Sequence, residues 1–294
     1  VKCWSTQMTG FRLLAFFAHP DDEAFPVGGA LAAHAAQGVE IRLITTTLGE
    51  EGEIRQEGAA TRETLPRIRG IELSCAVRAL GLASHRVLGY RDSGMVGTPP
   101  NSHPKAYVNA PSAEVVEQFV AEIRAFKPQV VLTFEPGGLY GHPDHIAVSR
   151  HTEEAFRLAN DPKAFPDQMV NGVYPHQAQR LFQSARPKGF RTMWATKLRA
   201  SGVDFPMPSP EQEEQGVPVE DIHLELDVDV DGHLESKMAC IMCHRTQVAA
   251  DWPYHRVPRE VTASILGREF YIRAFPEVQT GEKISEDFFA GLEP

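Results

Sequence analysis

The sequence predicts an α/β protein with a Rossmann-like, largely parallel sheet, helices on both faces of that sheet, and a smaller C-terminal mixed subdomain. First, short apolar runs alternate with amphipathic segments from Phe11 to about Ala159, a pattern typical of a parallel sheet covered by helices. Second, the segments after the expected strands are long, as in folds that build their site from such loops. Third, the alternation ends after Asn160, where Pro, Gly and polar residues become frequent.

The individual elements of the first part follow from local patterns. Short apolar runs predict strands at Arg12–Ala18, Glu40–Thr46, Arg86–Leu88 and Val130–Thr133. Amphipathic spacing predicts helices at Val27–Gln37, Thr61–Leu80, Ser112–Phe126 and Asp144–Ala159. We expect Ser112 to cap the third helix and Asp144 the fourth, because both residue types favour the N-cap position. Gly38 and Gly81 lie just past two helix ends, where a left-handed residue is favoured.

The second part is expected to be an α+β portion, residues 161–294, packed on a Rossmann-like core of residues 1–160 within one continuous domain. Its short elements stand between polar segments and are expected at Arg180–Phe182, Thr192–Lys197, Glu225–Val230 and Glu269–Phe275. Glu225–Val230 alternates strictly between polar and apolar residues, which is typical of a half-buried strand.

The composition argues against several classes of protein. The chain has 294 residues, 42% of them hydrophobic, and a formal net charge of −10. An acidic chain without long Lys or Arg runs is not expected to bind nucleic acid or an anionic membrane surface, and no apolar stretch approaches the ~20 residues of a membrane helix. Leu13–Ala18 is too short for a signal-peptide core. We therefore expect a soluble cytoplasmic protein that acts on a small molecule, and a homo-oligomer is left open.

Four cysteines, Cys3, Cys75, Cys240 and Cys243, are too few for a disulfide scaffold in a chain of this length. Cys240-Ile-Met-Cys243-His244 matches the attachment pattern of c-type haem and contains a C-x-x-C. It lies inside a helical pattern, however, where two cysteines on one face are typical of small core residues. We expect Cys240 and Cys243 to be core residues.

A cluster of one imidazole and three carboxylates follows the first expected strand. It is Ala18-His19-Pro20-Asp21-Asp22-Glu23, and it occupies a strand-to-helix turn, which in an open parallel sheet lies where ligands bind. Such a cluster alone is equally consistent with an acidic helix N-terminus. A second cluster, His142-Pro143-Asp144-His145, follows the expected strand Val130–Thr133. Because each cluster follows a strand and has Pro beside its first His, the sequence favours a metal site.

The two clusters together contain the ligands of a catalytic zinc site, which has three protein ligands and an open position for water. His19 and Asp22 are three residues apart in one turn, and His145 begins the helix after the fourth strand, at the same edge of the sheet. We therefore expect a site of two histidines and one aspartate for Zn²⁺, with Fe²⁺ left open. Asp21 is then the unligated carboxylate beside the bound water, whose pKa zinc lowers to about 7, and it can act as general base.

His142 and Asp144 complete the predicted chemistry. His142 could stabilise the oxyanion of a tetrahedral intermediate or protonate the departing amine, and Asp144 could orient and charge it. These roles predict metal-assisted amide hydrolysis by attack of a zinc-bound water. Glu23 receives no role beyond favouring the helix start or bracing a neighbour.

The motifs resemble those of the PIG-L or LmbE-like zinc-dependent N-acetylglucosaminyl deacetylases. Both fingerprints, A-H-P-D-D-E at Ala18–Glu23 and H-P-D-H at His142–His145, are complete. Weaker similarities extend along the chain, at Thr47–Glu53, Arg69–Leu73, Arg91–Met95, Tyr140–Gly141 and Lys237 with His244–Gln247. Arg91–Met95 and Tyr140–Gly141 are most similar to the thiol-biosynthesis branch, of mycothiol and bacillithiol type. Phe134–Leu139 departs from the usual P-x-G-G of the family, so the loop beside the metal is altered.

The resemblance implies roles for residues at the matching positions. His19, Asp22 and His145 would bind zinc, with Asp21 as general base and His142 as oxyanion stabiliser or acid. Arg69 and Asp92 would contact the sugar, and Tyr140 would be a mobile active-site residue.

The activity that the resemblance implies is removal of acetyl from an N-acetylglucosamine conjugate, such as a GlcNAc-inositol or GlcNAc-malate, giving a free amine and acetate. The alternative within the family is an amidase acting on a thiol S-conjugate or an antibiotic sugar. Two further classes are a metal-retaining binding module without turnover and a nucleotide-binding doubly wound domain. The first would need neither a base nor His142, and the second lacks a G-x-G-x-x-G after the first strand.

Overall fold

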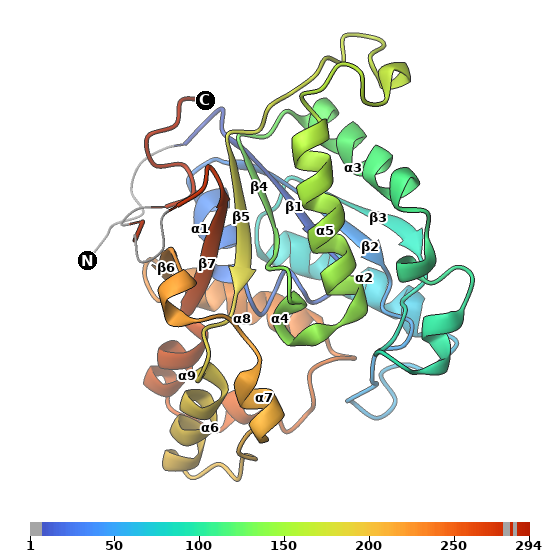
Figure 1. Ribbon diagram of the computed structural model, residues 1–294. Helices are drawn as coiled ribbons and strands as arrows, with labels where there is room; N and C mark the ends of the chain where they lie inside the picture. Colours follow the sequence, from blue (N-terminus) through green and yellow to red (C-terminus); the bar gives the residue numbers. More distant parts are fainter. Residues whose placement is uncertain (1–7, 279–282, 285–286) are drawn as a thin grey trace.

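The computed structural model describes residues 8–278, 283–284 and 287–294 and shows an α/β fold built on one seven-stranded sheet (Figure 1). In chain order, its strands and α-helices are β1 Arg12–Phe17, α1 Gly28–Ala36, β2 Glu40–Thr47, α2 Leu65–Ala79, β3 Ser84–Tyr90, α3 Ser112–Phe126, β4 Val130–Phe134, α4 Gly138–Gly141, α5 Pro143–Leu158, β5 Arg180–Ala185, α6 Phe190–Ala200, α7 Pro210–Glu214, β6 Leu224–Asp227, α8 His233–Cys243, α9 Arg259–Leu266 and β7 Arg268–Phe275.

The strand order is β3-β2-β1-β4-β5-β7-β6. The strands from β3 to β5 pair in parallel, whereas β7 runs antiparallel to both β5 and β6. This arrangement confirms the predicted fold class. The sheet itself continues past residue 160, because β5, β7 and β6 extend it, while the division into portions 1–160 and 161–294 stays a prediction.

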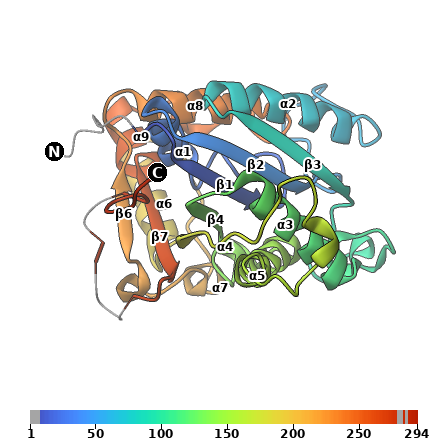
Figure 2. The same ribbon diagram turned by 90° about the horizontal axis from the view of Figure 1, so that it is seen from above.

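The helices cover the sheet on both sides (Figure 2), with α1, α2 and α8 on one face and α3 and α5 on the other. Central strands covered on both faces need continuous apolar runs, and β1 is fully buried beyond its first residue. Phe16 of β1 stacks on Phe119 of α3, with 4.3 Å between ring centroids, and burial of each such ring contributes roughly 1.5–3 kcal/mol. Among the described residues, no helix combines the length and the apolar character needed to cross a membrane.

Helix α1 begins with Gly28-Gly29 and has no side-chain cap from its own N-cap residue. A carboxylate from the other end of the chain takes that place. Glu269 of β7 is buried and accepts the N–H groups of Gly29 and Ala30 at 2.8 and 2.9 Å, and Lys237 donates to it at 2.7 Å. A carboxylate is favourable at this end of the helix dipole, so β7 and α8 stabilise the start of α1.

Two of the predicted helix caps are wrong. Helix α3 begins after Pro111, and no side chain caps it. Helix α5 is capped by His142, whose ring accepts the N–H of Asp144. The Asp144 carboxylate does not cap the helix, because it contacts His19 and the N–H of Ser93. The left-handed conformations predicted for Gly38 and Gly81 are confirmed, with φ of +94° and +72°.

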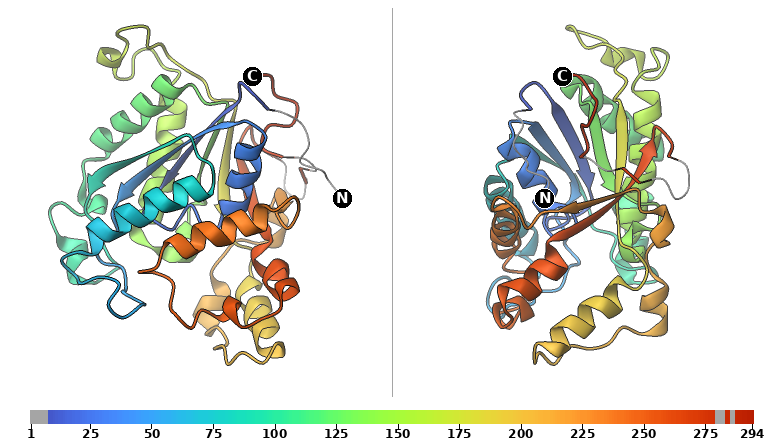
Figure 3. Two further views of the ribbon diagram at one scale, coloured as in Figure 1. Left: turned by 180° about the vertical axis from the view of Figure 1, so that it is seen from behind. Right: turned by 90° about the vertical axis from the view of Figure 1, so that its left-hand side faces the viewer.

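Cys75 of α2 and Cys243 of α8 form a disulfide, with 5.7 Å between their Cα atoms. The prediction of a core residue is confirmed for Cys240, which is free and buried. Cys243 is half-buried against the core and carries a disulfide that was not predicted; Cys3 lies outside the described residues. The bond forms because α2 (cyan) and α8 (orange) pack against each other on one face of the sheet (Figure 3). A separation of 168 residues left no local signal of this pairing.

We expect reduction of the Cys75–Cys243 bond to lower the free energy of unfolding by about 2–4 kcal/mol, because the bond closes a long loop in the unfolded chain. Urea unfolding with and without reductant measures this difference. The C75A/C243A variant is the control and should give the same curve in both conditions. Identical curves for oxidised and reduced wild-type protein would contradict the prediction.

Candidate active site

The site lies where the strand order reverses, at the carboxyl ends of β1 and β4, as expected for a doubly wound sheet. His19 and Asp22 follow β1, and His145 lies in the first turn of α5. His19 Nδ1 is 3.1 Å from His145 Nε2, His145 Nε2 is 3.3 Å from Asp22 Oδ1, and His19 Nδ1 is 3.6 Å from Asp22 Oδ2. All three side chains are buried. The structure thus brings the three predicted ligands together.

Asp22 is held by the turn that contains it. Its Oδ2 accepts the N–H groups of Ala18 and His19 at 3.1 and 2.7 Å, which leaves Oδ1 directed toward His145. Burial raises the pKa of Asp22, but the charges and hydrogen bonds of His145 and His19 outweigh that effect and hold it well below its usual range. The carboxylate is therefore ionised, as a metal ligand must be.

Carboxylates also face the second nitrogen of His19. Nε2 lies 3.2 Å from Asp144 Oδ2 and 3.6 Å from Asp92 Oδ1. These carboxylates are themselves fixed by the backbone, since Asp144 accepts the N–H of Ser93 at 3.0 Å and Asp92 that of Glu51 at 3.1 Å. A carboxylate on the far nitrogen of a metal-binding histidine sets the orientation of its ring. Asp144 and Asp92 therefore orient His19.

The residues present fit a metal ion. Two imidazole nitrogens about 2.0–2.1 Å from one tetrahedral zinc would lie a little over 3 Å apart, and His19 Nδ1 and His145 Nε2 are 3.1 Å apart. Two imidazoles and one carboxylate are a donor set typical of catalytic zinc or non-haem iron. His142 is a less suitable ligand, although its ring also lies within reach, because its Nδ1 already accepts the N–H of Asp144.

Asp21 stands beside the three ligands in a strained backbone conformation. Its φ is +113°, a region that favours glycine and costs other residues about 1–3 kcal/mol. Its Oδ2 lies 3.2 Å from Arg69 Nη2, and its N–H donates to Glu23 Oε2 at 3.0 Å. Burial raises the pKa of Asp21, and the charge of Arg69 opposes this. The neighbouring side chains therefore hold this carboxylate in an orientation that the backbone alone disfavours.

Arg69 connects two loops of the site. Its guanidinium is buried and donates to the carbonyl oxygens of Pro20 and, at 2.9 Å, Gly49. Gly49 has a φ of +65°, and a Cβ there would lie 1.8 Å from Arg69 Nη1, so only glycine fits. Arg69 thus positions Asp21 and the loop after β2, and its predicted contact with a sugar stays a prediction.

Glu23 has a structural partner that sequence reasoning missed. Its Oε1 lies 2.5 Å from His244 Nε2, and neither side chain is exposed. Burial lowers the pKa of His244, but the charge of Glu23 outweighs this and leaves that pKa above its usual value. Because the other oxygen of Glu23 accepts the N–H of Asp21, His244 supports the Asp21 turn through Glu23.

The residues after His244 continue this support. Thr246 donates to Glu72 of α2 through its N–H at 2.8 Å and through its hydroxyl at 2.6 Å, and Gln247 donates to the carbonyl oxygen of Glu53. The late segment His244–Gln247 and the helix segment Arg69–Leu73 are therefore in contact. Both segments resemble motifs of the same family, but no local pattern in either one predicts this contact.

We expect Glu23→Ala to lower kcat about 10–100-fold, the effect typical of residues that support a metal site, because the Asp21 N–H and His244 both lose their partner. Glu23→Gln, which keeps an oxygen acceptor, should retain more activity than Glu23→Ala. Steady-state kinetics and zinc content measured on both variants test this. A folded Glu23→Ala enzyme with wild-type kcat would show that the turn needs no such support.

His142 lies edge-on to His19, with 4.5 Å between ring centroids. Its Nδ1 accepts the N–H of Asp144 at 3.2 Å, so the proton of a neutral ring lies on Nε2. Burial and the neighbouring His19 and His145 lower the pKa of His142 to about 3. The Asp144 carboxylate contacts His19, and Asp144 orients His142 through its backbone N–H.

Tyr140 lies between the altered loop Phe134–Leu139 and His142. Glu135 accepts the N–H groups of Gly137 and Leu139 at 2.5 and 2.6 Å, and it thereby holds a turn in which Leu139 has a φ of +62°. The Tyr140 ring packs edge-on to His145, with 5.0 Å between ring centroids. Tyr140 therefore lies over a predicted metal ligand.

A pocket of about 270 Å³ opens beside the ligands. Its lining includes Asp21, Asp22, Tyr140 and His145. The other lining residues are mainly apolar, with the aromatic residues Phe25, Phe190, Trp194 and Tyr254, and four are charged, namely Arg186, Lys237, Arg268 and Glu269. Helices α6, α7 and α9 gather below the end of β5 (Figure 1), and α6 and α9 contribute part of this wall. The elements after residue 185 therefore form part of the wall of a cavity next to the predicted metal ligands.

A doubly wound sheet that carries two buried histidines, a buried aspartate within reach of both and a separate carboxylate beside them defines a candidate metal-dependent hydrolase. The family model PIG-L, described as GlcNAc-PI de-N-acetylase, matches residues 14–156. The chain belongs to the PIG-L family of deacetylases.

Relatives agree with this assignment, and a solved structure has a similar fold. The chain is 36% identical to 1D-myo-inositol 2-acetamido-2-deoxy-alpha-D-glucopyranoside deacetylase from Thermobispora bispora, over 90% of this chain and 88% of the relative. It is also 36% identical to the protein of the same name from Geodermatophilus obscurus, over 96% and 98% of the two chains. The fold is similar to that of N,N'-diacetylchitobiose deacetylase from Pyrococcus horikoshii, with a TM-score of 0.61, 18% identity and coverage of 89% and 83%.

Proposed function

We propose that this protein hydrolyses the acetamide of an N-acetylglucosamine conjugate and releases acetate and a free amine. The observation that carries the proposal is the buried group His19, Asp22 and His145 with Asp21 beside it, in a chain whose 36%-identical relatives are named as deacetylases of a GlcNAc-inositol. We propose Zn²⁺ as the metal, because two imidazoles and one carboxylate suit it. A metal held by these residues would lower the pKa of a water and polarise the acetyl carbonyl.

Asp21 is the proposed general base. It is close to the ligands and lines the same pocket, and Arg69 and Glu23 fix its orientation. In this position its carboxylate takes the proton of the attacking water. Arg69 is 2% exposed, so its proposed contribution to sugar binding depends on the loops that it holds.

His142 is the proposed donor to the oxyanion. With Nδ1 occupied by the Asp144 N–H, the Nε2–H of a neutral ring is available for the acetyl oxygen as it becomes negative. Asp92 faces both His142 and His19, at 3.9 and 3.6 Å, and we propose that it orients these rings as well as contacting the sugar. Tyr140 is proposed to close over the acetamide, since its ring already covers His145.

Acetate release from a panel of substrates tests the proposal. The panel contains GlcNAc-inositol, GlcNAc-malate, a thiol S-conjugate and a free peptide amide, each assayed with and without a chelator. We expect chelator-sensitive release from at least one GlcNAc conjugate. Turnover of the S-conjugate amide alone would assign the amidase activity, and no chelator-sensitive turnover of any member would refute hydrolysis by this site.

A further inference from the structure

We propose that the pocket beside the metal ligands binds an oxyanion carried by the substrate beyond its acetylated sugar, and that Arg186 is the residue that recognises it. The inference deepens the proposed deacetylation and rests on it. It concerns the part of the pocket lined by Arg186 and the residues after β5, to which the proposed chemistry assigns no role.

Arg186 directly follows β5 and lines the pocket. Its Nη1 is buried without a hydrogen-bond partner in the described part of the chain. No carboxylate of residues 8–278, 283–284 or 287–294 forms an ion pair with it within 4.0 Å. A buried donor on a charged group is costly to leave unpaired. A ligand that supplies the missing acceptor would remove this cost.

The surroundings of Arg186 increase the need for an anion. Burial, followed by the like charge of Arg191, lowers the pKa of Arg186 to about 10, so two cations stand together in a chain of net charge −10. The nearby carboxylates have other partners: Glu135 accepts the N–H groups of its own turn, and Glu213 accepts the hydroxyl of Thr192. The cluster of Arg186 and Arg191 is therefore left without a full counter-charge.

The chemistry of the pocket defines the ligand class. A guanidinium binds carboxylate or phosphate through two parallel hydrogen bonds. The walls next to it are aromatic, and the rings of Trp194 and Tyr254 stack with 6.4 Å between centroids. Lys237 and Arg268 also line the pocket but form ion pairs with carboxylates. Apolar walls with one unpaired cation, Arg186, suit a planar or hydrocarbon group that ends in an oxyanion. We therefore infer a GlcNAc conjugate with an apolar, anionic second group.

A pair of isosteric substrates tests the inference. The para-carboxyphenyl glycoside of GlcNAc carries the anion, and the para-carbamoylphenyl glycoside has the same shape without charge. We expect wild-type kcat/KM to favour the carboxylate roughly tenfold or more, as for a hydrogen bond to a charged group. In Arg186→Gln the ratio should fall to about one, and in Arg186→Lys it should lie between. A para-phosphonophenyl glycoside shows whether phosphate or carboxylate is preferred.

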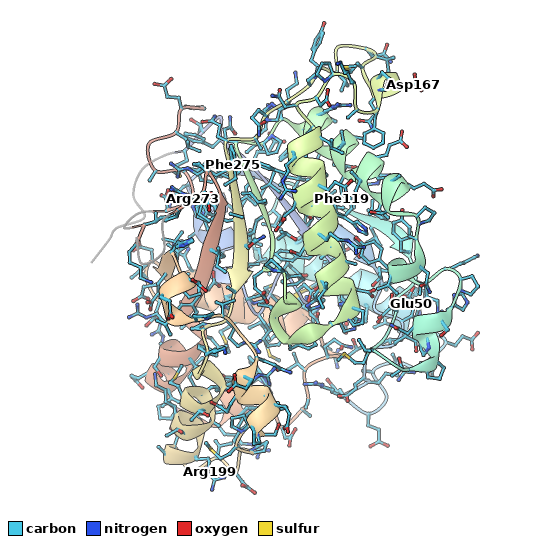
Figure 4. The ribbon with its side chains drawn as sticks, viewed as in Figure 1. Glu50, Phe119, Asp167, Arg199, Arg273 and Phe275 are labelled. Atoms are coloured by element: carbon cyan, nitrogen blue, oxygen red, sulfur yellow. A yellow bond between two sulfur atoms is a disulfide. The ribbon has the colours of Figure 1, made fainter. Side chains whose placement is uncertain are left out.

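Arg199→Gln is the matched control. Arg199 lies at the exposed end of α6 (Figure 4), so this substitution changes the net charge equally without touching the pocket and should keep the wild-type ratio. A wild-type ratio near one overturns the inference without any variant. A carboxylate preference that persists in Arg186→Gln also overturns it, because a group other than Arg186 then recognises the anion.

Failure of the proposed deacetylation and failure of the oxyanion site can be told apart by measuring binding. If neither glycoside is deacetylated, calorimetry of both glycosides binding to the zinc-loaded wild-type protein and to Arg186→Lys still measures the preference. Tighter binding of the carboxylate by wild type than by the variant supports the oxyanion site while the deacetylation fails. Deacetylation with equal affinity for both glycosides supports the activity and refutes the site.

Discussion

Asp21→Asn should lower kcat/KM for deacetylation by about 10²–10⁴-fold, the usual contribution of a general base, while the metal content stays at the wild-type level. The amide keeps the size of the side chain but cannot take a proton from water. Metal binding should persist because Asp21 lies outside the group formed by His19, Asp22 and His145. Kinetics with a GlcNAc conjugate, together with metal analysis of the same sample, measure both quantities.

Asp251→Asn is the control for this substitution, because Asp251 is exposed and belongs to no part of the site. Its kcat/KM should equal that of wild type. An Asp21→Asn enzyme within tenfold of wild type would assign the base to another group, and an enzyme without metal would show that Asp21 is a ligand.

His145→Ala should weaken zinc binding by more than about 100-fold, since mutation of residues that only support a ligand already lowers metal affinity by about 10–100-fold. Activity should be lost together with the metal. The substitution removes one of three protein donors, and Asp22 Oδ1 loses the partner at 3.3 Å. Dialysis against a graded zinc buffer followed by metal analysis gives the affinity. Zinc should also raise the midpoint of thermal unfolding of wild type far more than that of the variant. A ligand stabilises a folded protein only to the extent that the folded state binds it, and the variant should bind zinc weakly.

His255→Ala tests whether loss of any histidine has the same effect, since His255 is exposed and remote in the chain from both clusters. It should keep its zinc and its thermal shift. The strongest contrary result would be one tightly bound zinc in the double variant His19→Ala, His145→Ala, because that variant retains only Asp22 of the three ligands.

The sequence was most informative where local patterns determine structure. β1 and β4 are short, mainly apolar runs, so their position was predicted within one residue at each end. The convergence of His19 and His145 followed from a general rule, because the carboxyl ends of parallel strands meet at one edge. Both predictions needed only short segments and the direction of the strands.

Long-range pairings were beyond the same reasoning. Leu181 pairs with Phe275 in the antiparallel part of the sheet, Glu23 pairs with His244 across 221 positions, and Cys75 bonds to Cys243. None of these contacts has a local pattern that specifies its partner. The contact of the Asp144 carboxylate with His19 was missed for a related reason. Both His19 and His142 lie close to Asp144 only in the folded protein, so the sequence does not specify which of them the carboxylate contacts.

The support of Asp21 from two distant helices limits how small a working enzyme can be. Arg69 comes from α2, and His244 directly follows α8, the helix that Cys243 bonds to α2. A fragment that ends at residue 160 would retain both fingerprint motifs, all three proposed ligands and the carboxylate proposed as base. It would lack Glu269 at the start of α1 and the histidine behind Glu23. Grafting the two motifs onto another doubly wound scaffold would therefore transfer the metal site without the support that fixes its base.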